Sequence, residues 1–152
     1  MFETNIIMSV KLDSVLKSDS HLLGYFPNSY ILLMKEKIGP WIVLVPRQQE
    51  NLTEWHELTE SQQNSLNKEI NCISHCLKNE FSTDKLNISI IGNIVSQLHI
   101  HIVSRQKNDY IWPKPIWGNT KNIQFSSSEI MFIKNKIINY LSQKFDDFKL
   151  SE

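Results

Sequence analysis

One segment near the middle of the chain alternates between apolar and polar side chains, and this alternation constrains the fold more than any other feature. It reads Gln97-Leu98-His99-Ile100-His101-Ile102-Val103-Ser104-Arg105. Successive side chains of a β-strand point to opposite faces of the sheet. The leucine and isoleucines would therefore enter a core, while Gln97, His99 and His101 would line the other face in one row. Same-face neighbours lie roughly 7 Å apart on a strand, a spacing that suits several side chains holding one small anionic group.

The segment resembles the signature of the histidine triad (HIT) family, in which three histidines alternate with apolar residues and two further apolar residues follow. One histidine is missing here, so either Gln97 replaces the first or Val103 replaces the third. In many members an arginine stands four residues after the third histidine, as Arg105 stands after His101. The resemblance therefore places Gln97 in the first triad position, His99 in the second and His101 in the third.

The resemblance extends over most of the chain. Residues 29–34 and 39–47 are similar to the leading hairpin of the family, which ends in Val-Pro and a basic residue, and residues 86–93 precede the histidine strand as in family members. The tail Trp112-Pro113-Lys114-Pro115-Ile116-Trp117-Gly118 resembles a bacterial branch that also carries glutamine in the first triad position.

Length and composition indicate one small domain. A chain of 152 residues is expected to build one core, so we expect a single domain over residues 1–152. Lys and Arg total 16, as do Asp and Glu, and this balance argues against nucleic acid as a partner. No window approaches the roughly 18 apolar residues of a membrane span. The N-terminal sequence lacks a basic region followed by an apolar stretch, so we expect no secretory signal and a cytoplasmic location.

The remaining patterns predict an α+β fold, with an antiparallel sheet of about five strands, a long helix packed on it and a C-terminal helix. Capping boxes at Thr59/Gln62 and Ser126/Glu129 predict where the long helix and the last helix begin. Other segments are assigned by periodicity and turn residues: a short helix around 12–16, strands at 29–34, 41–45, 85–91 and 97–105, and a loop at 106–124.

The resemblance implies which reaction the row of Gln97, His99 and His101 carries out. Imidazole is mostly unprotonated at pH 7 and can form a covalent nucleotidyl intermediate. His99 would be the nucleophile at a nucleotide α-phosphorus, His101 would donate a hydrogen bond to phosphate oxygens, and Gln97 would orient the phosphate or the leaving group. Ser96 and Asn93 would add neutral donors. A carboxamide holds no titrating proton, so Gln97 is the main departure from the family.

Three further residues are candidates for nucleotide binding. Asn87 lies on the strand before the triad, where relatives carry an asparagine, and Arg105 falls in a segment that matches the family. Trp112 would stack on a base, ahead of Trp117 and Trp41.

Cys72, His75 and Cys76 lie within one turn of the long helix, which raises the question of a metal site. A structural zinc site needs four ligands, usually from two separate pairs, and no second cysteine pair exists. We therefore expect reduced thiols, no metal and no cofactor.

Three function classes remain open. The first is a HIT-type enzyme that hydrolyses or transfers nucleoside monophosphates. The second is a nucleotide-binding module with a weakened triad. The third is a metal-dependent hydrolase that uses His99 and His101 as ligands. A homodimer is expected from the resemblance, and apolar residues that would otherwise meet water give an independent reason: Cys72, Cys76, Trp112, Ile116 and Trp117.

Overall fold

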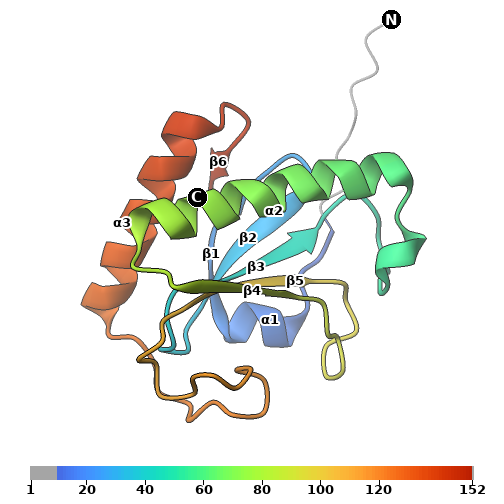
Figure 1. Ribbon diagram of the computed structural model, residues 1–152. Coiled ribbons are helices and arrows are strands. Elements are labelled where there is room, and N and C mark those ends of the chain that lie inside the picture. Colours follow the sequence, from blue (N-terminus) through green and yellow to red (C-terminus); the bar gives the residue numbers. More distant parts are fainter. Residues whose placement is uncertain (1–9, 152) are drawn as a thin grey trace, which may run out of the picture.

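The strand-forming segments assemble into one antiparallel sheet (Figure 1). The computed structural model describes residues 10–151. The strands are β1 (Ser20–Tyr25), β2 (Ser29–Met34), β3 (Trp41–Pro46), β4 (Lys85–Ser89), β5 (Ile100–Arg105) and β6 (Lys149–Leu150). Their order in the sheet is β4-β5-β3-β2-β1-β6, and each neighbouring pair is antiparallel. The α+β fold with an antiparallel sheet is thereby confirmed.

The helices begin where the capping residues predicted. The helical elements are α1 (Ser14–Ser18), the 3-10 helix η1 (Trp55–Glu57), α2 (Glu60–Glu80) and α3 (Ser127–Lys144). Both capping boxes are present, with Thr59 and Ser126 as the N-cap residues of α2 and α3. No helix in the described part of the chain is long and apolar enough to cross a membrane.

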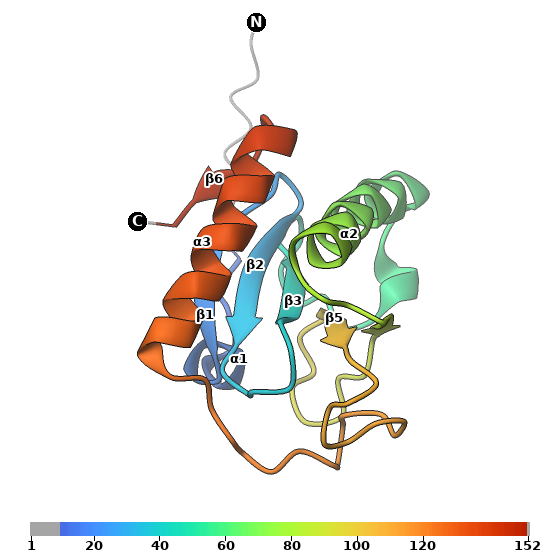
Figure 2. The same ribbon diagram turned by 60° about the vertical axis from the view of Figure 1, so that its left-hand side comes forward.

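The sheet is covered on both faces by different parts of the chain. Helices α2 and α3 pack on one face, here called the helix face, to which Leu33, Ile42 and Ile102 point. The other face, here called the histidine face, carries Val43 and its cross-strand partner His101. Figure 2 shows α1 and the loop of residues 106–124 on the side of the sheet away from α2. The central strands β3 and β5 are consequently buried along their whole length.

Two strands escaped prediction and one begins later than expected. The alternation in β1 is interrupted by a register shift between Leu22 and Gly24, so its pattern is not periodic. Gly24 lies so close to the Lys149 carbonyl of β6 that a Cβ atom would clash with it, and β6 is too short to show a pattern. Strand β5 begins at Ile100 rather than at residue 97.

Cys72 and Cys76 do not widen the apolar surface of α2, contrary to the expectation from sequence. Both thiols are free and buried in the core of the helix face, because α3 packs against α2 and closes over this side. Ile116 is also fully buried. The larger exposed apolar residues near one sheet edge instead belong to β4 and the segment after it: Ile88, Ile90, Ile91 and Ile94.

Candidate active site

The two histidines of the central segment lie side by side on the histidine face. His99 immediately precedes β5 and His101 is its second residue. Their ring centres are 4.7 Å apart, and the ring planes are inclined by 73°. Only 6% of His99 and 5% of His101 is exposed. The alternation in the sequence thus places both imidazoles in one sheltered row, as predicted.

The tautomer of His101 is fixed by a tryptophan on the neighbouring strand. The Trp41 indole Nε1–H, at the start of β3, donates a hydrogen bond to His101 Nδ1 over 3.0 Å. An indole N–H can only donate, so Nδ1 carries a lone pair and the proton of the neutral ring sits on Nε2. Burial, together with the neighbouring His99, lowers the pKa of His101 to about 3. His101 is therefore neutral at physiological pH and presents an Nε2–H donor.

The tautomer of His99 is the opposite one. His99 Nδ1 lies 2.6 Å from the backbone carbonyl oxygen of Gln97. A carbonyl oxygen only accepts, so Nδ1 carries the proton and Nε2 of the neutral ring holds a lone pair. Two adjacent imidazoles thereby differ in function, with a nucleophilic nitrogen on His99 and a hydrogen-bond donor on His101.

Aromatic rings surround His101. The ring centres of Trp41 and Trp117 lie 5.6 Å and 5.3 Å from the His101 ring. The indole Nε1 of Trp117 is buried and has no partner among the described residues. Sequence reasoning ranked Trp112 above both, but Trp41 and Trp117 are the tryptophans that contact the histidine pair.

Arg105 organises the loop after β5 and has little capacity left for a phosphate. Its guanidinium is buried, and Nε and Nη2 donate to the Asp109 carboxylate over 2.7 and 3.0 Å. Nη1 donates to the Asn87 side-chain oxygen over 3.0 Å and to the Lys114 carbonyl over 2.9 Å. The guanidinium carbon also lies 5.7 Å from the centre of the Trp112 ring.

These contacts involve all three of the further residues that the sequence offered as candidates for nucleotide binding. Arg105, the Asn87 oxygen and Trp112 are engaged with one another and with the loop, so their observed contacts are structural. Burial alone would raise the pKa of Asp109, but the hydrogen bonds from Arg105 and from backbone N–H groups outweigh it and hold the pKa below its usual value. The Arg105–Asp109 pair is thus charged and holds the loop that carries Trp117.

Gln97 is also engaged on both sides of its amide. Its Oε1 accepts from the Asp13 backbone N–H over 2.8 Å, and its Nε2 donates to the Lys11 carbonyl over 3.0 Å. In this structure the Gln97 side chain therefore ties down the segment before α1. Ser96 and Asn93 lie exposed nearby, with their side chains open to solvent.

A cavity lies beside Gln97, and neither His99 nor His101 is among its lining residues. Its volume is about 530 Å³. It lies between the segment before α1, the loop after β3 and the residues before β5, with the lining Lys11, Leu12, Asp13, Ser14, Glu50, Asn51, Leu52, Thr53, Ser96 and Gln97. Asn51 has a left-handed backbone with φ of 57°. Such conformations are uncommon outside glycine and cluster at functional sites.

The described residues contain no group of three or more His, Cys, Asp or Glu side chains that could hold a metal ion. Burial, with smaller contributions from neighbouring acidic groups, raises the pKa of Cys72 and of Cys76 to about 12. Both are protonated thiols and poor ligands. In addition, His101 Nδ1 is occupied by Trp41, so this pair offers a metal little of its donor capacity.

Comparison with known proteins finds a matching family and solved structures that share this fold. The HIT domain family matches residues 15–108. A histidine triad protein of Bradyrhizobium japonicum is 36% identical, with 87% of this chain and 98% of that chain covered and a TM-score of 0.83. A HIT protein of Sinorhizobium meliloti is 33% identical, with 89% of this chain and 99% of that chain covered and a TM-score of 0.84. A histidine triad protein of Marinobacter aquaeolei is 33% identical, with 89% of this chain and 98% of that chain covered and a TM-score of 0.83. No curated protein matches the chain.

Proposed function

The chain belongs to the histidine triad family, and we propose that it is a nucleotide-binding hydrolase or nucleotidyltransferase of the HIT type. It acts at the α-phosphorus of a nucleotide derivative through an intermediate on His99. We place it in the bacterial branch with glutamine in the first triad position, and we propose that residues 1–152 form one domain.

The observation that carries this proposal is the pair of opposite tautomers. His99 directs its Nδ1 proton to the Gln97 carbonyl and keeps a lone pair on Nε2, while His101 Nδ1 accepts from Trp41 and its proton therefore sits on Nε2. A nucleophile and a donor for the phosphate oxygens, set side by side in a buried site, are what displacement at phosphorus requires.

The steps follow from these positions. The His99 Nε2 lone pair attacks the α-phosphorus, a nitrogen–phosphorus bond forms, and the bond to the leaving group breaks with its electron pair. The His99 ring becomes positively charged, and its Nδ1–H bond to the Gln97 carbonyl stabilises that charge. His101 donates to an oxygen on the phosphorus as negative charge develops there. Water, or an acceptor alcohol or phosphate, then attacks phosphorus, and the nitrogen–phosphorus bond breaks with its electron pair on Nε2, which regenerates the neutral ring. Any proton of the incoming group passes to solvent.

The same contacts favour substrates whose leaving group departs as a stable anion. His101 holds no transferable extra proton near pH 7, since its pKa is about 3, and a carboxamide at Gln97 cannot titrate. General acid catalysis contributes about 10²–10⁴-fold where a leaving group needs a proton. We therefore propose a phosphoanhydride as the substrate class. An adenosine 5′-phosphoanhydride should exceed the matched phosphoramidate in kcat/KM, and equal rates would exclude the preference.

The intermediate is the direct test of the enzyme. Wild-type protein incubated with an adenylated substrate labelled at phosphorus should retain acid-labile, alkali-stable label. His99→Ala should retain none, and His101→Ala should be labelled more slowly. His75→Ala, an exposed histidine on α2, is the matched control and should behave as wild type. Label that persists in His99→Ala would refute His99 as the nucleophile. Tight nucleotide binding without label in the wild type would indicate a binding module.

We also propose a homodimer, with the β4 edge of the sheet in the interface. Strand β4 is an outer strand, and an unpaired edge with exposed apolar residues is a site of association unless it is covered. Ile88 is 52% exposed and Ile94 is 92% exposed. This surface replaces the one expected from Cys72 and Cys76.

A further inference from the structure

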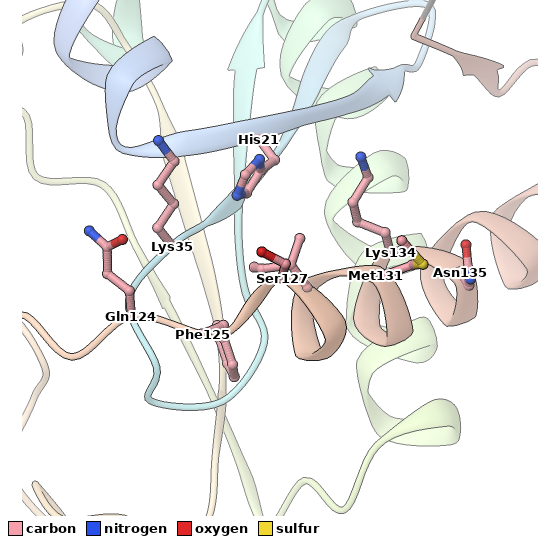
Figure 3. A pocket seen from close by; sticks show the side chains of 9 residues that line it. His21, Lys35, Gln124, Phe125, Ser127, Met131, Lys134 and Asn135 are labelled. Atoms are coloured by element: carbon pink, nitrogen blue, oxygen red, sulfur yellow. The ribbon is translucent and has the colours of Figure 1, made fainter.

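A second cavity lies on the helix face, on the other side of the sheet from the histidine pair. Its volume is about 480 Å³. It is bounded by β1, by the end of β2 and by the first half of α3, and its lining residues are His21, Lys35, Gln124, Phe125, Ser127, Ile130, Met131, Lys134 and Asn135. His21 is paired with Leu33, which points into the core of the helix face. In Figure 3 the His21 ring lies between the side chains of Lys35 and Lys134.

The charge of this lining is one-sided. It contains two lysines and a histidine but no aspartate or glutamate, although acidic and basic residues are balanced in the whole chain. Within the described residues, ion pairs involve Lys37, Arg105 and Lys136. Lys35 and Lys134 thus keep their charge without an acidic partner.

Neighbouring carboxylates are engaged elsewhere. Glu36 accepts a hydrogen bond from the Tyr110 hydroxyl, and Glu129 is paired with Lys37. Neither lines the cavity. The positive potential is therefore not neutralised by the adjoining residues of β2 or α3.

The polar groups of the cavity have unused hydrogen-bonding capacity. Lys35 Nζ donates to the Ser18 carbonyl over 2.6 Å, which leaves two of its three protons. Among the described residues, no side-chain hydrogen bond is formed by the other polar lining residues, which are His21, Gln124, Ser127, Lys134 and Asn135. Burial lowers the pKa of His21, and the neighbouring charges of Lys35 and Lys134 lower it further.

We propose that this cavity binds the phosphate group of a small phosphomonoester, in a site separate from the histidine pair. Lys35 and Lys134 would contact the phosphate oxygens, with His21 and Ser127 as further donors. Phe125 and Met131 offer apolar surface to the organic part of the ligand. The site goes beyond the proposed function and does not depend on it.

The test uses His21 as a reporter. Phenyl phosphate and inorganic phosphate are titrated into the full chain at constant ionic strength, and the imidazole resonances are followed by NMR, with His21→Gln for assignment. A bound dianion favours the charged ring, so the His21 pKa should rise with saturable dependence on ligand. Phenyl phosphate should bind more tightly than phosphate.

Charge-matched variants complete the experiment. Lys35→Gln/Lys134→Gln should weaken binding by about tenfold or more, the order expected for two charge-assisted hydrogen bonds. Lys68→Gln/Lys144→Gln removes the same net charge from exposed helix positions and should leave binding unchanged. His99→Ala should also leave the His21 response intact. A response that does not saturate, that chloride reproduces, or that survives in the Lys35/Lys134 variant would overturn the proposal.

Discussion

Replacing Trp41 by phenylalanine should change the protonation of His101 while leaving its surroundings filled. The substitution removes the indole N–H that holds the proton of His101 on Nε2. A phenylalanine ring still occupies the space beside His101 and Trp117. The variant therefore tests the hydrogen bond rather than the packing.

The expected size of the effect follows from burial. Trp41 is 7% exposed and His101 is 5% exposed, so water does not replace the lost donor efficiently. A buried acceptor left unsatisfied costs about 1–3 kcal/mol of stability. The free energy of unfolding should fall by that amount. The kcat should fall by about tenfold, since a net hydrogen bond is worth about 1.4 kcal/mol at most in positioning the Nε2–H donor. The KM should change less, because binding does not depend on this proton alone.

Two measurements test this reasoning. Nitrogen NMR of the His101 ring should show one tautomer in the wild type and a mixture in Trp41→Phe. The His101 pKa should stay low in both, because its causes, burial and the neighbouring His99, are retained. Turnover of a fluorogenic adenylated substrate gives kcat. Trp117→Phe is the matched control, because the Trp117 indole N–H has no partner among the described residues. If Trp41→Phe keeps one tautomer and full kcat, or if Trp117→Phe loses as much, the tautomer argument fails.

Other predictions concern the hydrogen bonds of Gln97, the dependence of stability on pH, and the dimer. Gln97→His should lower kcat/KM and speed proteolysis before α1, because the two ring nitrogens of an imidazole do not reproduce the placement of the amide oxygen and nitrogen that hold this backbone. Higher turnover would instead mean that glutamine only weakens the site. The His101 pKa is lower in the folded chain than in the unfolded one, so the unfolded chain binds more protons between pH 6.5 and about 3. The free energy of unfolding should therefore decrease as pH falls through this window, by up to about 1.4 kcal/mol per pH unit. Denaturant titrations at several pH values should show a weaker dependence of this free energy on pH in His101→Asn. Ile88→Lys should give monomers in sedimentation if the β4 edge forms the dimer, and an unchanged mass would exclude that edge.

The sequence predicted those elements whose formation depends on interactions between residues close together in the chain. The capping boxes at Thr59 and Ser126 satisfy helix N–H groups within one turn, so the starts of α2 and α3 follow from neighbouring residues. The alternation around His99 and His101 fixed their common face for the same reason. Strand β1 was missed because its register shift removes the alternation on which such predictions rest.

The partners of the site residues were beyond sequence reasoning because they are distant along the chain. Trp41 reaches His101 only through the pairing of β3 with β5. Gln97 contacts the segment before α1, although 84 residues separate it from Asp13. Arg105 was a candidate for nucleotide binding because it falls in a segment that matches the family. Its burial with Asp109 and Asn87 depends on how the loop returns to the strand.

Gln97 and Trp41 both limit the number of protons that can move in the site. Gln97, which we propose stands in the first triad position, is a carboxamide that cannot titrate, and it uses both ends of its amide to hold backbone. Trp41 holds the neutral His101 ring in one tautomer, while burial and the neighbouring His99 lower the pKa of that ring to about 3. A bell-shaped pH–rate profile requires two titrating groups in the working range, and neither residue supplies one. Any acidic limb in the profile must therefore arise from other groups or from the substrate. A site arranged in this way gains fixed donor geometry at phosphorus and gives up the means to protonate a basic leaving group.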